Sequence, residues 1–295
     1  MLRWLKLLLI MLLGFGGLSA SGWAAGPEVT VVLTSNSGPY KEALGGFQKA
    51  FGAPISVFAL SDGVPTIPSG TRIIVAIGGK AALTHYPSWP LLIYCLAPGT
   101  QVKPEEHPGR RLNIHSDPSV YLSVAKFKEL QPSLKRIALI WAGDSIQDII
   151  DQTNDIARRL NVEIVSNRVR NSGDLPDVLR SLKGKVDALW LPADAMIVSP
   201  QNVATMKEFS LANGIPFYVP SAVMVAQGAT ASVSTTFADI GALTAQMTQK
   251  AMHGTLDTDH VFPENIHVAI NSTSSKICNL KISDELLKQA DKVIP

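Results

Sequence analysis

Short hydrophobic runs alternate along the chain with segments whose apolar residues recur every three or four positions. The run Val29–Leu33 has the length and β-branched content of a strand, and a cluster of turn-forming residues follows it at Ser35–Pro39. Tyr40–Phe51 then places its apolar residues on one face of a helix. The pattern therefore predicts a strand, a turn and an amphipathic helix as the first structural unit.

The same alternation continues to the end of the chain. Nearly continuous apolar runs indicate strands that are covered on both faces, as in parallel sheets. Such strands are predicted at Ile55–Ala59, Arg72–Gly79, Leu91–Cys95, Arg136–Trp141, Glu163–Val169, Asp187–Pro192, Ile215–Pro220, Thr230–Ser234 and, as the last strand, His267–Asn271. Helices are predicted at Lys80–His85, Pro118–Leu130 with Asp117 as its N-cap, Ile146–Leu160, Leu175–Leu182, Pro200–Asn213 and Phe237–His253.

Repeated strand–helix units predict an α/β fold with parallel sheets and helices on both faces. The predicted strands, about ten, outnumber those of one doubly wound sheet. We therefore expect two Rossmann-like lobes. The polar, proline-bearing stretch Pro98–Asn113 is predicted to connect them.

The first residues have the pattern of a secretory signal peptide. Arg3 and Lys6 precede the apolar run Leu7–Leu13, and small residues follow as far as Ala25. A membrane anchor is the alternative, but a span needs about 20 apolar residues and glycines interrupt this run early. We expect residues 1–24 to be removed after Ala24, leaving a soluble periplasmic protein.

Composition narrows the class of protein. The 295 residues are 46% hydrophobic and 17% charged, which excludes a disordered chain. The net charge is +2, and both excess positive charges, Arg3 and Lys6, lie in the predicted signal peptide. The remaining chain is neutral, so electrostatics give no reason to expect a nucleic-acid partner.

Metal and disulfide chemistry have little support in the sequence. Two cysteines, Cys95 and Cys278, exclude a four-thiolate zinc site, and the six histidines lack metal-ligand spacing. We expect neither a metal nor a cofactor. Export permits a disulfide between Cys95 and Cys278, whereas two buried free thiols are the alternative.

A candidate site follows from the predicted topology, because open parallel sheets bind ligands outside the carboxyl ends of their strands. Hydroxyls, glycines, an acid and two aromatic residues occupy those ends. The predicted contacts are Ser35, Asn36, Tyr40, Gly78, Gly79 and Ala97 in the first lobe and Trp141, Asp194, Ser221 and Thr235 in the second.

These residues suit a small zwitterionic ligand. Helix N-termini can hold a carboxylate, and either Asp194 or Asp144 could pair with an ammonium group. Tyr40 and Trp141, at facing strand ends, could stack on an apolar or aromatic part of an amino acid. The alternative is that these are ordinary loop and capping residues, and that Trp141 fills space behind the cleft.

Enzyme signatures are largely missing. The chain has no G-x-S-x-G nucleophile motif, no phosphate-binding GxxxxGK[ST] motif and no GxGxxG after a strand. His115 and Asp117 are close enough to suggest a catalytic dyad, but we favour the alternative of a polar connection with a helix cap. We expect no enzymatic activity.

An ordered series of stretches resembles a known family. These are IIVAIGGKAAL, LLIYCLAPG, KRIALIWAGDS, KVDALWLPADAMIVSP, the segment Ala212–Gly254, and the ending His267–Ile294. They are similar to the periplasmic substrate-binding proteins of bacterial ABC transporters, within the type I fold that includes tryptophan and tyrosine receptors. This chain departs from the family in the short, proline-bearing LSDGVPTIPSGT, where members usually have a helix.

The resemblance implies two lobes joined by three crossing segments, with a small ligand enclosed between them by hinge closure. The first lobe would comprise residues 27–114 and 237–264, and the second residues 115–236 and 265–295. The resemblance also implies a monomer that delivers its ligand to an ABC permease. A sensory or accessory binding protein that signals to another inner-membrane partner is the alternative.

Overall fold

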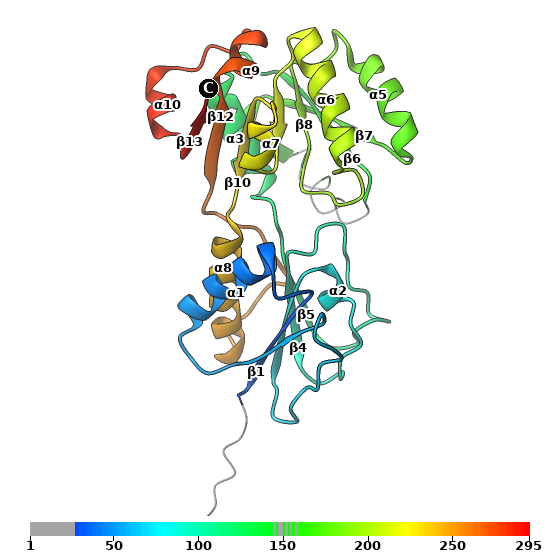
Figure 1. Cartoon of the computed structure of the whole chain (residues 1–295), viewed down its shortest axis with the longest axis vertical. Helices are drawn as coiled ribbons and strands as arrows, with labels where there is room; N and C mark the ends of the chain where they lie inside the picture. The colour runs from blue at the N-terminus through cyan, green and yellow to red at the C-terminus, as the bar shows by residue number, and fades with distance from the viewer. Residues whose placement is uncertain (1–26, 144–145, 147–149, 151–152, 154, 157–158) are drawn as a thin grey trace, which may run out of the picture.

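A computed structural model describes residues 27–143, 146, 150, 153, 155–156 and 159–295. The predicted signal peptide and Asp144 lie outside this part of the chain, as does much of the predicted helix Ile146–Leu160. The described residues form two α/β lobes, one above the other in Figure 1. Each lobe is built on its own sheet.

The N-lobe contains a six-stranded sheet in the order β11-β5-β4-β3-β1-β2. All of its strand pairs are parallel. Its strands are β1 (Val29–Leu33), β2 (Ser56–Ala59), β3 (Ile73–Ile77), β4 (Leu91–Cys95), β5 (Arg111–Ile114) and β11 (His260–Val261). Its helices are α1 (Gly38–Phe51), α2 (Gly79–Ala82) and α8 (Phe237–Met252). Residues 60–72, between β2 and β3, form no helix.

The C-lobe contains a seven-stranded sheet in the order β13-β12-β10-β9-β8-β6-β7. Its strands are β6 (Arg136–Trp141), β7 (Glu163–Arg168), β8 (Ala188–Trp190), β9 (Phe217–Val219), β10 (Ala231–Ser234), β12 (His267–Asn271) and β13 (Lys292–Ile294). Its helices include α3 (Val120–Leu130), α5 (Leu175–Leu182), α6 (Pro200–Asn213), α7 (Ala222–Ala226), α9 (Ser272–Ile277) and α10 (Asp284–Gln289), with a 3-10 turn, η2, at Ser172–Asp174. β12 runs antiparallel to β10, and the other pairs are parallel.

Helix α8 belongs to the N-lobe although it follows a C-lobe strand. It packs against α1, and two glycines allow a very close approach. A Cβ atom on Gly46 would lie 2.0 Å from the Ala238 carbonyl oxygen, and one on Gly241 would lie 1.9 Å from that of Ala43. Because these contacts are with backbone atoms, no larger residue fits, and α8 is fixed to the N-lobe along its length.

Within the described residues, the chain passes between the lobes three times. It crosses from β5 to α3, from β10 to α8, and from β11 to β12. We call the residues between these elements the first, second and third crossing segments: 115–119, Thr235–Thr236 and 262–266.

Three predictions were wrong, concerning the connection between the lobes, the last strand and a helix cap. Pro98–Asn113 does not connect the lobes, because its end forms most of β5 and pairs with β4. His267–Asn271 is not the last strand, because β13 pairs with it. The N-cap of α3 is Ser119 rather than Asp117, since the Ser119 Oγ accepts a hydrogen bond from the Leu122 amide at 3.3 Å.

The two cysteines are free and buried in different lobes, Cys95 on β4 and Cys278 after α9. Burial raises the pKa of the Cys95 thiol to about 12, and it also raises that of Cys278. Both thiols are therefore protonated and act as small hydrophobic groups. The alternative of two buried free thiols describes this arrangement.

Candidate ligand-binding cleft

Strand ends from both lobes meet at a small pocket beside the first crossing segment. The pocket has a volume of about 30 Å³. Its lining includes Ala97–Thr100 after β4, His115–Asp117 of the first crossing segment, and Ala193 after β8. Gly99, with φ +80°, lies next to the loop after β8, because a Cβ atom there would lie 3.7 Å from the Cβ of Ala195. This pocket holds a water-sized molecule, so a larger ligand would contact the strand ends around it.

Four predicted contacts of the N-lobe lie together at the ends of β1, β3 and β4. Gly78 has φ +105°, and a Cβ atom there would lie 2.6 Å from Tyr40 Cε1. Its amide donates to the Cys95 carbonyl at 2.8 Å, which places it beside the turn that leads to Ala97. A Cβ atom on Gly79 would lie 3.0 Å from Thr100 Oγ1. Tyr40 therefore lies against the glycine turn and packs on the N-lobe core, and its contact with a ligand stays a prediction.

Ser35 and Asn36 follow β1 on the same edge of the sheet. Ser35 is half-buried, and its hydroxyl lies 3.1 Å from that of Ser37. Asn36 is exposed. Both side chains are accessible to a ligand at this edge.

Trp141 ends β6 and packs into the C-lobe core. Its side chain is buried, and Nε1 donates to the Ser166 hydroxyl at 2.8 Å. The Arg168 guanidinium lies 5.0 Å from the ring centroid, close enough for a cation–π interaction. The ring is thus held by the C-lobe itself in this structure, and its stacking on a ligand stays a prediction.

Asp194 is held by three backbone amides. Its Oδ2 accepts from Ala142 at 2.7 Å and from Gly143 at 2.8 Å, while Oδ1 accepts from Met196 at 2.9 Å. The residue is only 1% exposed. A Cβ atom on Gly143 would lie 2.8 Å from Oδ1, so the turn after β6 needs glycine there. The carboxylate joins the loops after β6 and β8, and its predicted bond to a ligand ammonium would add to these contacts.

Asp117 was not among the predicted ligand contacts, yet it lines the pocket. Its Oδ2 accepts a hydrogen bond from the Ala193 amide at 2.7 Å. Burial raises the pKa of this carboxyl to about 7, and the nearby Asp194 raises it further while the Ala193 amide opposes the shift. The sequence offered one signal for this role, since Ser119 suits the N-cap and leaves Asp117 available for other contacts.

His115 takes part in the packing between crossing segments. Its ring stacks on Phe262 of the third segment, with centroids 3.9 Å apart and planes at 11°. Burial, followed by the charge of His260, lowers its pKa to about 4. The imidazole is therefore neutral near pH 7. The ring is thus stacked on the third crossing segment, whereas Asp117 accepts a hydrogen bond from the Ala193 amide.

The last two predicted contacts have structural partners. Ser221 is the N-cap of α7, where its Oγ accepts from the Met224 amide at 3.4 Å. Thr235 lies in the second crossing segment and donates to the Asn265 carbonyl at 2.8 Å.

Among the described residues, no cluster of three or more His, Cys, Asp or Glu side chains could hold a metal ion. Within that same part of the chain, no helix has the length and apolarity needed to cross a bilayer.

Two α/β lobes with mainly parallel sheets and three crossing segments between them form the fold of type I periplasmic binding proteins. The family described as ABC transporter substrate binding protein matches residues 67–294, and the chain belongs to that family. Members bind small molecules and work with ABC permeases, outside the cytoplasm. The predicted fold class and the predicted family are confirmed.

The sequence identity between this chain and individual similar proteins is low. A tyrosine-binding protein from Clostridioides difficile (strain R20291) is 28% identical over 207 residues, which are 64% of this chain and 59% of that protein. The chain thus matches less than two thirds of the length of this relative.

Two solved structures share the fold. One is an ABC domain in complex with L-Trp from Streptococcus pneumoniae, with a TM-score of 0.60 and 20% identity; the match covers 90% of this chain and all of that one. The other is a ligand-free, open substrate-binding protein with adhesive properties from Clostridium difficile. Its TM-score is 0.63 at 15% identity, over 90% of this chain and 98% of that one.

Proposed function

We propose that this chain binds an amino acid, or a similar small organic molecule with an apolar or aromatic part, between its two lobes. The observation that carries the proposal is the pocket where the end of β4 meets Asp117 and the loop after β8. A carboxyl group at such a place can pair with a ligand ammonium, which would also lower the pKa of Asp117. The tyrosine-binding relative and the tryptophan complex are consistent with a ligand of this class.

The proposed contacts come from both lobes, so that closure completes the site. Strand-end residues of the N-lobe would meet the polar and apolar parts of the ligand, and C-lobe residues would close over it. They are Ser35, Asn36, Tyr40, Gly78, Gly79, Ala97, Trp141, Asp194, Ser221 and Thr235, with Asp117 added. Hinge closure around a ligand is common in two-lobed binding proteins. No catalytic step is proposed.

A thermal-shift screen tests the ligand class. The mature chain would be heated with L-amino acids, sugars and inorganic anions in separate samples. Aromatic or apolar L-amino acids should raise the melting temperature, because a ligand that binds only the folded state stabilises it. Stabilisation by sugars alone would overturn the amino-acid proposal while leaving the family assignment in place.

Tyr40 offers a variant that tests the site directly. Tyr40→Leu should weaken binding of an aromatic amino acid roughly twofold to tenfold in calorimetric titration, because ring stacking contributes about 0.5–1.5 kcal/mol beyond burial. Tyr121→Leu is the matched control, since Tyr121 is an exposed tyrosine on α3. Equal affinities for Tyr40→Leu and the wild type would remove Tyr40 from the site.

The proposed cellular role is that of an exported, monomeric receptor that delivers its ligand to an ABC permease. N-terminal sequencing of the secreted protein should begin at Ala25. The sensory alternative is distinguished by partner: co-purification with a permease supports transport, whereas co-purification with a membrane kinase or cyclase supports signalling. The absence of a helix at residues 60–72 alters the N-lobe surface and is the observation that keeps this alternative open.

A further inference from the structure

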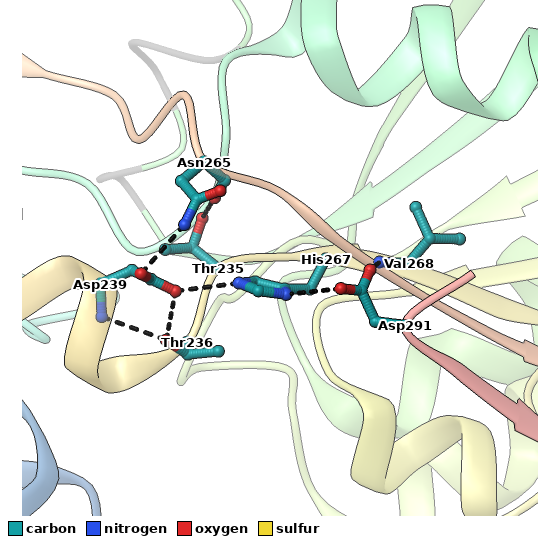
Figure 2. Close-up of polar contacts among 7 residues, drawn as sticks. All are labelled: Thr235, Thr236, Asp239, Asn265, His267, Val268 and Asp291. Atoms are coloured by element: carbon teal, nitrogen blue, oxygen red, sulfur yellow. Dashed lines mark hydrogen bonds and ion pairs between the residues drawn. The ribbon is translucent and has the colours of Figure 1, made fainter. Parts of the chain in front are cut away.

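A histidine at the start of β12 joins the two lobes through its ring nitrogens (Figure 2). His267 Nε2 lies 2.9 Å from Oδ2 of Asp239, in the first turn of α8. Its Nδ1 lies 3.0 Å from Oδ1 of Asp291, the residue before β13. Asp239 is fixed to the N-lobe through α8, whereas Asp291 belongs to the C-lobe. The imidazole therefore lies between carboxylates of different lobes.

The same carboxylate ties two crossing segments to each other. Asp239 Oδ1 accepts from Asn265 Nδ2 at 3.0 Å, and the Asn265 carbonyl accepts from the Thr235 hydroxyl. Thr236 caps α8, because its Oγ1 accepts the Asp239 amide at 3.1 Å and its hydroxyl donates to Asp239 Oδ2. Any rotation of the lobes must change dihedral angles in these segments, so this network lies where hinge motion is absorbed.

The two-sided contact depends on the proton state of His267. A neutral imidazole has one N–H donor, whereas the imidazolium ion has two. Both ring nitrogens here face carboxylate oxygens, so only the imidazolium can donate on both sides. Among the described residues, the charged groups that face the ring are Asp239 from α8 and Asp291 from the turn before β13.

The titration directions agree with this geometry. The hydrogen bond with Asp291 raises the pKa of His267 most, and Asp239 adds to the rise, while desolvation opposes it. Desolvation favours a higher pKa for both carboxyls, but their hydrogen bonds outweigh it. Those from Thr236 and His267 lower the pKa of Asp239, and those from Val268 and His267 lower the pKa of Asp291.

We propose that His267 is a pH-dependent latch that holds the lobes in the orientation seen here when its ring is protonated. Deprotonation leaves the ring able to donate to only one of the two carboxylates, so the hinge loosens as the pH rises. The latch is fully formed below pH 6.5, the ordinary pKa of an imidazole. It is lost as the pH rises through the raised pKa of His267. It also fails in acid, when the two carboxyls become protonated. This device concerns lobe orientation and does not depend on the identity of the ligand.

Hydrogen exchange of the ligand-free mature chain tests the latch. Wild type and His267→Gln would be compared at about pH 5.5 and about pH 8.5, on either side of the ordinary imidazole range. At the lower pH, amides of the first turn of α8 and of residues 262–268 should exchange roughly twofold to fivefold faster in His267→Gln, as for loss of a solvated ion pair. At the higher pH the difference should disappear. The control is His253→Gln, because His253 is exposed at the other end of α8.

A second variant separates the latch from a purely structural role. In an NMR titration, His267 should titrate above 6.5 in the wild type, and Asp291→Asn should move its midpoint down, because the hydrogen bond with Asp291 is the largest cause of the raised pKa. The latch is overturned if His267→Gln exchanges like the wild type at the lower pH, or if its difference persists at the higher pH. An unchanged midpoint in Asp291→Asn would also overturn it. Because no ligand is present, these outcomes are independent of the proposed amino-acid binding.

Discussion

The inner end of the cleft and the hinge each combine histidine with aspartate, and they use these residues in opposite ways. At the cleft, burial raises the pKa of Asp117 to about 7 and lowers that of His115 to about 4, so both groups are pushed toward their neutral forms. At the hinge, hydrogen bonds raise the pKa of His267 and lower that of Asp239, which favours the charged forms. Solvent access accounts for the difference, because the His267 side chain is 34% exposed whereas Asp117 is buried.

This difference assigns different tasks to similar residues. A buried carboxyl near its titration point gains most from a cationic ligand, which restores the charge stabilisation that burial removed. A solvated ion pair stabilises little but responds to small changes of pH. The cleft is therefore suited to binding and the hinge to adjustment of lobe orientation.

The largest expected effect concerns Asp194, the most deeply buried carboxylate of the cleft. Asp194→Ala leaves three backbone amides without their acceptor, and each buried unpaired donor costs about 1–3 kcal/mol. We expect the free energy of unfolding to fall by about 3–5 kcal/mol in urea denaturation. The matched control is Asp187→Ala, because Asp187 also accepts from two backbone amides, at Lys135 and Arg136, but in solvent-exposed bonds.

Water can replace the Asp187 bonds, so the control should lose only about 1 kcal/mol. Equal losses for the two variants would show that burial does not distinguish these carboxylates. The argument that solvent access distinguishes the cleft from the hinge would then lose its support.

Asp117 should give the fold a stability that falls as the pH rises. Its folded pKa of about 7 lies above the ordinary 3.8, so the folded state holds the proton more tightly between these values. Asp117→Asn removes this titration and should gain on the order of 2–4 kcal/mol relative to the wild type between about pH 4 and about pH 8. Asp62→Asn, at an exposed position, is the control. Parallel stability curves for Asp117→Asn and the wild type would contradict the predicted shift.

The stability that His267 contributes should also fall as the pH rises, but by much less than the stability contributed by Asp117. The reason is that His267 takes part in a solvated charged interaction. Its raised pKa contributes stability that is complete below 6.5 and lost as the pH rises through the folded value. His267→Gln should therefore destabilise the chain by roughly 0.5 kcal/mol at about pH 5.5 and by almost nothing at about pH 8.5. The two variants change the free energy of unfolding in opposite directions. Asp117→Asn should raise it at high pH, whereas His267→Gln should lower it at low pH. An Asp117-sized effect at His267 would mean that the hinge is not solvated as described.

Sequence patterns predicted the strands that are mostly apolar. The bounds of β1, β4 and β6 agree with the predicted runs, because a buried parallel strand has a nearly continuous apolar sequence, and those of β12, which is antiparallel to β10, agree as well. The short strands β5, β11 and β13 were missed; β11 and β13 lie at sheet edges, and β5 lies next to β11. Each has two to four residues with a charged or polar member, as in Arg111–Ile114, and the neighbouring strand rather than local sequence makes it a strand.

Only the part of the candidate site that follows from the order of strands in the sheets could be predicted. Strand ends located Gly78, Tyr40 and Ala97 at one edge, since the carboxyl ends of parallel strands share it. The role of Asp117 depends on an amide 76 residues away, and the hinge network joins α8, the third crossing segment and the turn before β13. Such contacts follow from the packing of the two lobes and have no local signature.

Small-angle X-ray scattering of the mature chain, with and without saturating L-tyrosine or L-tryptophan, tests the central claim that a small ligand is enclosed between the lobes. Saturating ligand should reduce the radius of gyration, because the lobes close around it. The same amino acid should give saturable one-to-one binding in calorimetry. Binding with an unchanged radius of gyration would contradict enclosure between the lobes, and no binding of any amino acid would contradict the proposed ligand class.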